Sequence, residues 1–119
     1  MPNKEKANPY YHPESLGIVE VFEAEDADLS YEFDIFLLFV HSDGRVFSAQ
    51  DSGCSCPTPF EDYEGTTIEE CGLKLVTSVS QAVSLYNKWA EQVYSRNSVS
   101  KSEGDVRAFA EKHIKTNKL

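Results

Sequence analysis

The chain has 119 residues, of which 40% are hydrophobic and 26% are charged, which suits one compact domain and excludes a multidomain enzyme. The longest apolar run, residues 35–40, is far shorter than the roughly 20 residues that span a bilayer, so we expect a soluble protein without membrane contact. Residues 1–16 contain no apolar signal segment, and we therefore expect a cytoplasmic protein.

The net charge of −9 is unevenly distributed along the sequence. Residues 1–73 contain 16 acidic and three basic residues, whereas residues 74–119 contain four acidic and eight basic residues. Because nucleic-acid binding depends on Lys and Arg, we expect no direct contact with DNA or RNA. The acidic stretches predict a solvated surface, and the alternatives are a surface that attracts a basic partner or one that imitates duplex phosphates. Opposite charges on the two halves would also permit a homo-oligomer.

The N-terminal third of the chain predicts an arm followed by two strands. Residues 1–15 are polar and contain three prolines, so we expect a flexible arm with Tyr10-Tyr11 as its only apolar feature, ahead of one domain over residues 16–119. Residues 16–23 are rich in β-branched and aromatic side chains and predict a strand. Residues 31–40, YEFDIFLLFV, predict a strand near the centre of a sheet, with its second face partly covered by a helix.

A hairpin is expected directly after this strand. The dipeptide Asp-Gly at 43–44 lies between apolar runs, and residues 45–50 form the returning strand. A three-residue loop would pair Phe47 with Phe39, whereas a two-residue loop would pair it with Val40. The sequence leaves both registers open.

Beyond residue 70 the pattern changes from strand to helix. Residues 71–76 predict a short strand, and apolar residues at helical spacing predict helices over 79–94 and 106–114. Residues 78–81 and 102–105 have the spacing of capping boxes. Strands first and helices last predict an α+β fold, with a small, mostly antiparallel sheet of three or four strands backed by two C-terminal helices.

The segment 51–65, DSGCSCPTPFEDYEG, is the candidate binding site. Its prolines restrict the preceding residues to extended geometry, so we expect a stiff loop that costs little entropy to present to a partner. The predicted binding residues are Ser52, Gly53, Cys54, Cys56, Pro57, Pro59, Phe60, Glu61, Asp62 and Tyr63. The alternative is a loop folded over one end of the core, with Cys54, Cys56 and Phe60 buried.

Three kinds of chemistry at this segment are disfavoured. Cys54, Cys56 and Cys71 with His41 or His12 would form a zinc site, but C-x-C with one distant Cys is not the usual ligand spacing. A disulfide would leave one thiol over, and a reducing compartment opposes it. The neighbouring carboxylates raise a thiol pKa and so oppose nucleophilic catalysis. We therefore expect no catalytic residue, no metal and no cofactor, and hence no enzyme.

Residues 31–65 combine an aromatic-rich strand, an Asp-Gly hairpin and the string SGCSCPTPFE. This block resembles a small uncharacterised domain family of tailed bacteriophages of actinobacteria. The resemblance implies a phage accessory protein in the host cytoplasm, and it assigns no functional residues. We expect a non-enzymatic module that binds a host or phage protein through residues 52–63 and the adjoining acidic surface. The alternatives are an acidic nucleic-acid mimic that inhibits a DNA- or RNA-binding enzyme, and a Cys-based metal or redox domain.

Overall fold

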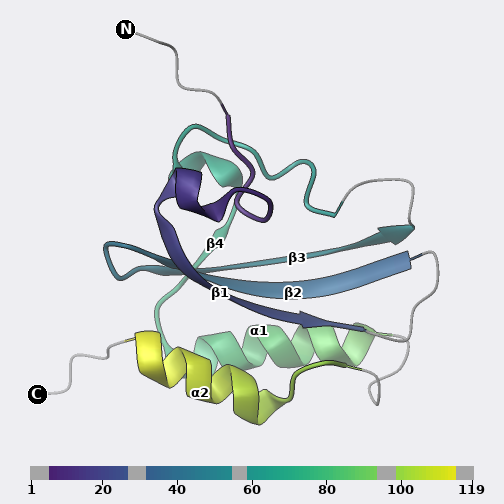
Figure 1. Ribbon diagram of the computed structural model, residues 1–119. Helices are drawn as coiled ribbons and strands as arrows, with labels where there is room; N and C mark the ends of the chain where they lie inside the picture. Colours follow the sequence, from purple (N-terminus) through teal and green to yellow (C-terminus); the bar gives the residue numbers. More distant parts are fainter. Residues whose placement is uncertain (1–5, 27–31, 55–58, 94–98, 115–119) are drawn as a thin grey trace, which may run out of the picture.

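Figure 1 shows the computed structural model as a sheet with two helices on one face and irregular segments on the other. The described residues are 6–26, 32–54, 59–93 and 99–114. The four antiparallel strands are β1 (Ile18–Glu25), β2 (Glu32–His41), β3 (Val46–Cys54) and β4 (Lys74–Val76), and they lie in this order in the sheet. The helices are α1 (Val79–Gln92) and α2 (Glu103–His113). The predicted α+β fold is confirmed.

β2 lies between β1 and β3 and contributes to two hydrophobic cores, one on each face of the sheet. Its side chains alternate between the faces, as the geometry of a strand requires. The core beneath the helices contains Phe36, Leu38 and Val40. The core on the opposite face contains Ile35, Leu37 and Phe39. The central position predicted for this strand is confirmed.

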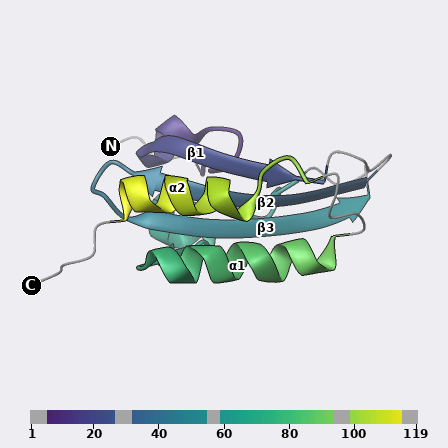
Figure 2. The same ribbon diagram turned by 90° about the horizontal axis from the view of Figure 1, so that it is seen from below.

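Both helices cover the same face of the sheet. Figure 2 shows α2 across β1 and β2, and α1 along the side of β3. Trp89 of α1 is 2% exposed and packs on Phe36, with ring centroids 5.8 Å apart. Its indole N–H donates to Asp34 Oδ1 at 2.7 Å, so the carboxylate at the polar end of β2 is tied to the helix. Phe109 of α2 packs on Phe22 of β1 in the same way, at 5.3 Å.

Serine residues cap both helices at their N-termini. Ser78 Oγ accepts a hydrogen bond from Gln81 N at 3.1 Å, but the Gln81 side chain accepts from Thr77 N, so this predicted capping box is half formed. The second box is complete, because Ser102 Oγ accepts from Asp105 N at 3.2 Å while Asp105 Oδ2 accepts from Ser102 N at 2.8 Å. Each cap satisfies amide groups that the first helical turn leaves without partners.

Residues 6–15 pack on the rest of the domain, in contrast to the flexible arm expected over residues 1–15. Ala7 forms a β-bridge with Gly65, with hydrogen bonds of 2.9 and 3.1 Å. Tyr10 packs on Phe60, with ring centroids 4.9 Å apart. The segment covers the sheet face opposite to the helices, because the apolar side chains on that face of β2 must also be removed from water.

The hairpin between β2 and β3 has the register of a three-residue loop. Phe39 pairs with Phe47 and Val40 pairs with Val46, so one of the two open registers is confirmed. Gly44 adopts a φ of 97°, the left-handed conformation that closes such a loop.

All four strands have limits that differ from those predicted, and β3 and β1 show the physical reason. β3 continues to Cys54, because the N-terminal part of β2 supplies ladder partners as far as Glu32. β1 begins only at Ile18, because a 3₁₀ turn over Pro13–Leu16 precedes it and ends at Gly17, whose φ is 78°. The end of β3 is therefore set by its pairing with β2, and the start of β1 is set by the turn that precedes it.

Candidate functional site

The predicted binding segment continues β3 and then returns over the sheet face opposite to the helices (Figure 1). Its first residues belong to the end of β3, namely Ser52, Gly53 and Cys54. A turn contains its last residues, namely Pro59, Phe60, Glu61, Asp62 and Tyr63. Cys56, Pro57 and the Cys54 side chain lie outside the described residues.

Phe60 is the anchor of this turn. Its side chain is 1% exposed and packs between the rings of Tyr10 and Tyr63, at centroid distances of 4.9 and 5.4 Å. Its backbone N–H donates to Asp51 Oδ2 at 2.8 Å, and its carbonyl accepts from Asn8 Nδ2 at 2.5 Å. Phe60 was expected on the binding surface, but the packing of the turn closes it to a partner. The buried alternative holds for this residue.

Further hydrogen bonds hold the turn in one position. The Tyr11 hydroxyl donates to the carbonyl of Pro59 at 2.7 Å, and the Tyr63 hydroxyl donates to the carbonyl of Gln50 at 3.1 Å. The bridge from Ala7 secures the far end of the turn. The N-terminal segment and β3 thus both hold the backbone of the turn. Such a backbone loses little conformational entropy when a partner binds, so the turn is preorganised.

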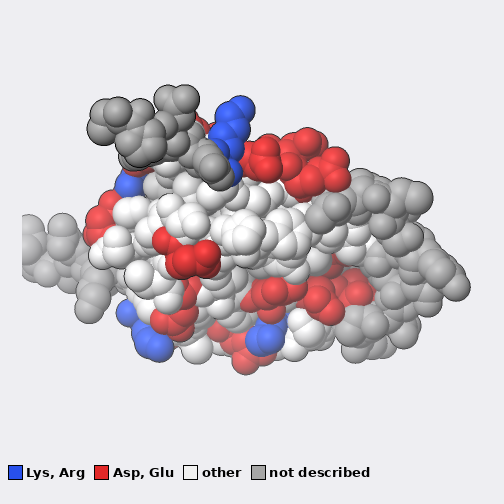
Figure 3. Space-filling model, turned by 45° about the horizontal axis from the view of Figure 1, so that its top comes forward, with Lys and Arg blue, Asp and Glu red and all other residues white. Residues whose placement is uncertain are grey.

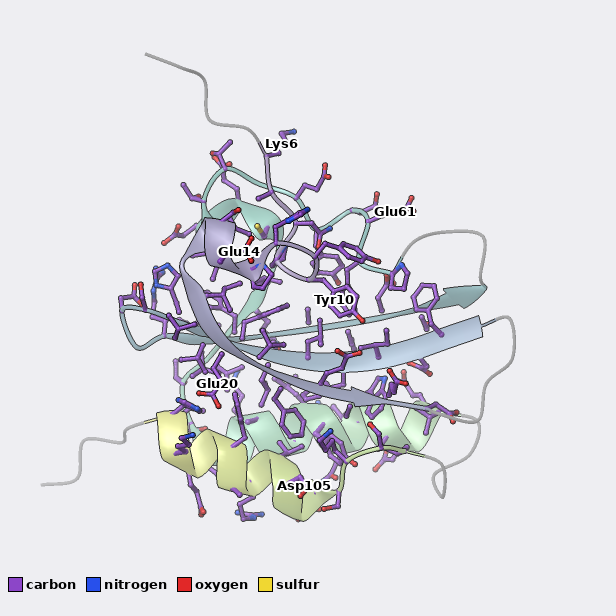
Figure 4. All side chains as sticks on the ribbon, viewed as in Figure 1. Lys6, Tyr10, Glu14, Glu20, Glu61 and Asp105 are labelled. Atoms are coloured by element: carbon purple, nitrogen blue, oxygen red, sulfur yellow. The ribbon has the colours of Figure 1, made fainter. Side chains whose placement is uncertain are left out.

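Three exposed carboxylates follow the anchor, and we call Glu61, Asp62 and Glu64 the acidic ridge. A groove of about 400 Å³ runs between the ridge and the N-terminal segment. Tyr11, which is 42% exposed, and Lys6 line the groove together with Glu61 and Glu64. Figure 4 shows Lys6 and Glu61 on the opposite side of the sheet from Asp105 of α2. The groove therefore combines an aromatic ring with two carboxylates and one ammonium group.

The pKa values of two tyrosines report the negative potential at this face. Burial raises the pKa of Tyr11, and the charges of Glu61 and Asp51 raise it further. Burial raises the pKa of Tyr63 as well, and Asp51 and Asp62 add to the effect. Each carboxylate opposes the formation of a phenolate beside it and, by the same field, favours a cation.

The acids on the face seen in Figure 3 form separate groups with uncharged surface between them. A mimic of duplex DNA or RNA needs carboxylates in a regular row, as phosphates are spaced along a duplex. The alternative of a nucleic-acid mimic gains no support on this face.

Cys71 lies in the core opposite to the helices and is 3% exposed. Burial raises the pKa of its thiol, and Glu70 and Glu69 raise it further, so the thiolate is disfavoured. Within residues 6–26, 32–54, 59–93 and 99–114, no three His, Cys, Asp or Glu residues are placed to hold a metal ion. Because the structure describes neither the side chain of Cys54 nor residue 56, the metal and redox alternatives stay predictions.

Sequence reasoning missed the contribution of the N-terminal segment to this site. Asn8 and Tyr11 hold the turn, and Tyr11 also forms a wall of the groove. The pair Tyr10-Tyr11 was the signal available in the sequence. Two adjacent aromatic residues in a polar stretch indicate packing against the domain, because burial of aromatic rings is stabilising.

Comparisons with known proteins place the chain in a family. Within the described ranges, neither α1 nor α2 has the length and apolar composition of a membrane-spanning helix. No curated protein and no solved structure matches the sequence. Residues 7–116 match a family described as a domain of unknown function, DUF7574. The match extends from the N-terminal segment that lines the groove to the end of α2. The chain therefore belongs to the DUF7574 family.

Proposed function

We propose that this chain is a non-enzymatic protein-binding module whose contact surface is the acidic ridge and the groove beside it. The observation that carries the proposal is the rigid presentation of Glu61 and Glu64 next to the exposed ring of Tyr11. Phe60 and its hydrogen bonds hold this surface in place before any partner arrives.

The chemistry of the groove favours a basic segment of the partner. A Lys or Arg side chain in the groove would meet the Glu61 and Glu64 carboxylates and stack on the Tyr11 ring. The charge of the whole chain, −9, would also speed the encounter with a basic protein. From the resemblance of residues 31–65, we propose that a phage encodes the chain and that the partner is a host or phage protein in the host cytoplasm.

The test is recovery of bound proteins from host lysate with three forms of the chain. Glu61→Lys with Glu64→Lys reverses the ridge, while Glu91→Lys with Glu111→Lys makes the same change in net charge at exposed positions of α1 and α2. We expect wild type and the helix variant to recover the same protein, and the ridge variant to recover at least about tenfold less. Equal recovery by all three forms would contradict the proposal.

A further inference from the structure

β3 has an open edge beyond its short contact with β4. β4 pairs only with residues 46–48 of β3, whereas β3 continues to Cys54. In the described part of the chain no other strand pairs with residues 49–54. α1 nevertheless runs along the side of β3, as Figure 2 shows. The helix thus flanks a stretch of β3 beside which the described residues place no further strand.

The register of the hairpin shows which backbone groups this edge presents. His41 N donates to the carbonyl of Arg45 at 2.8 Å, and the pairs of the β2–β3 ladder alternate from there. In an antiparallel ladder, only every second pair exchanges hydrogen bonds across the two strands. Gln50 and Ser52 belong to the other pairs, so their N–H and C=O groups point outward from β3. This edge can therefore form a further ladder.

Two side chains confirm that these backbone groups point outward. The Tyr63 hydroxyl donates to the carbonyl of Gln50 at 3.1 Å. Asp51 Oδ1 accepts from the N–H of Ser52 at 3.0 Å. A strand arriving at the edge would exchange these two side-chain bonds for ladder bonds, so neither backbone group would lose a partner.

Two cavities lie one after the other along the open edge. The first, about 160 Å³, lies beside Lys74, the first residue of β4, and is also lined by Phe36, Ala49, Tyr63 and Leu85, among others. The second, about 320 Å³, is lined by Asp34, Asp51, Ser52, Trp89 and Gln92, and Gln50 borders both. The first cavity is mainly apolar and has one cationic residue, Lys74, in its lining, whereas the lining of the second includes the acidic residues Asp34 and Asp51.

We propose that an extended segment of a partner protein adds to β3 as an antiparallel strand, with Lys or Arg opposite Ser52 and an apolar residue opposite Gln50. Side chains of one strand face the same way at every second residue, which matches the succession of the two cavities. In an antiparallel strand the basic residue comes first, so the recognised pattern is Lys/Arg-x-apolar. Every ladder in this sheet is antiparallel, and the partner strand follows the direction of β4.

Charge fixes this register and argues against a second copy of the chain as the occupant. Asp34, on the face that the helices cover, attracts a basic side chain to the second cavity, while Lys74 repels it from the first. A second β3 would bring the carboxylate of its own Asp51 to an edge that already contains Asp51, with no basic residue in β3 to offset it. A basic partner segment meets no such repulsion.

The inference rests on the proposed function in one respect, because both treat the chain as a protein-binding module. It uses a different surface, since the open edge of β3 lies outside the groove beside the acidic ridge. The ridge variant Glu61→Lys with Glu64→Lys is therefore expected to retain binding at the edge. If the ridge variant recovers no lysate protein but still binds a peptide at the β3 edge, the two surfaces act independently. Failure of one proposal can then be told apart from failure of the other.

The experiment is selection from a library of random capped hexapeptides on the wild-type chain, followed by NMR titration of the best peptide. We expect enrichment of Lys/Arg-x-apolar, saturable shifts at Gln50, Ser52 and the Trp89 indole, and slowed hydrogen exchange at the Gln50 and Ser52 amides. Methylation of the backbone nitrogen of the peptide's apolar residue removes the donor to the Gln50 carbonyl, and we expect at least tenfold weaker binding.

Three variants complete the test. Ser52→Pro removes an outward N–H and is expected to weaken binding at least tenfold, whereas Val21→Pro, at the other edge of the sheet, is the matched control and leaves it unchanged. Asp34→Asn keeps an acceptor for Trp89 but removes the charge, so it loses the preference for Lys or Arg. No enriched pattern, or binding that backbone methylation leaves unchanged, would overturn the proposal. The proposal would also be overturned if, without peptide, the chain formed a concentration-dependent dimer in which the Gln50 and Ser52 amides were protected from hydrogen exchange.

Discussion

At the residue scale, Phe60 shows how one side chain can change its role between a sequence and a fold. In the sequence it is an aromatic residue in a proline-containing loop, which suggests a contact for a partner. In the structure it has a φ of 61° and supports the turn from beneath. Non-glycine residues adopt this conformation only where the surroundings stabilise it, and here the packing and the bonds to Asp51 and Asn8 do so.

We predict that Phe60→Ala lowers the free energy of unfolding by about 3–5 kcal/mol, because it leaves a cavity between two tyrosine rings. Urea unfolding followed by circular dichroism measures this change. The matched control is the exposed neighbour in Glu61→Ala, for which we expect a change within about 0.5 kcal/mol. A loss below about 1 kcal/mol for Phe60→Ala would mean that the turn is not anchored there.

At the element scale, caps and turns set where helices and strands begin. Gly17 ends the 3₁₀ turn before β1, and Gly44 closes the hairpin, both with positive φ. Ser102 and Asp105 fix the start of α2. These local devices involve residues within a few positions of one another, which is why the sequence indicated the hairpin and both caps.

The two glycines predict different costs of replacement. A Cβ at Gly44 meets nothing within 4 Å, so Gly44→Ala should cost only the backbone strain, about 1–2 kcal/mol. A Cβ at Gly17 would lie 2.8 Å from His41 Nε2, and the His41 ring is held by the Asp43 amide. We therefore expect Gly17→Ala to lose a further 1–3 kcal/mol or so in urea unfolding. Equal losses would show that the His41 ring moves freely.

The cap of α2 predicts a dependence of stability on pH. The Ser102 backbone N–H, and then its hydroxyl, hold the pKa of Asp105 below its ordinary value of 3.8. The folded chain thus binds this proton less tightly than the unfolded chain, so the stabilisation is complete above that value and is lost as pH falls through the folded-state pKa.

Asp105→Asn tests this dependence. Urea midpoints between about pH 5 and about pH 2 should fall less steeply for Asp105→Asn than for wild type. Asp43, Glu69 and Glu70 also have lowered pKa values and remain in both proteins, so only the difference between the two curves reports Asp105. Parallel curves would contradict a contribution from the capping box.

At the scale of the whole molecule, β2 joins two cores into one cooperative structure. Phe36 and Leu38 face the helices, while Leu37 and Phe39 face the N-terminal segment and the turn at Phe60. Loss of either core removes the support for the same strand. We therefore expect the two faces to unfold together.

The single tryptophan, Trp89, provides the test, because it lies in the core beneath the helices. We predict that its fluorescence and the far-ultraviolet circular dichroism report the same thermal midpoint in wild type. In Phe60→Ala, which perturbs the opposite core, both midpoints should fall by the same amount. A fluorescence midpoint that stays in place while the dichroism midpoint falls would show that the two cores unfold separately.

Local sequence patterns were enough to predict the alternating strand of β2, the Asp-Gly hairpin, the two helices and their serine caps. These features depend on periodicity and on sterics within a few residues, so the chain encodes them locally. Local patterns did not determine that Tyr11 and Glu61 would form one groove, that Phe60 would turn inward, or that β3 would extend beyond β4. Such features arise from contacts like that between Asn8 and Phe60, which are 52 positions apart, and only the packing of the whole chain brings them together.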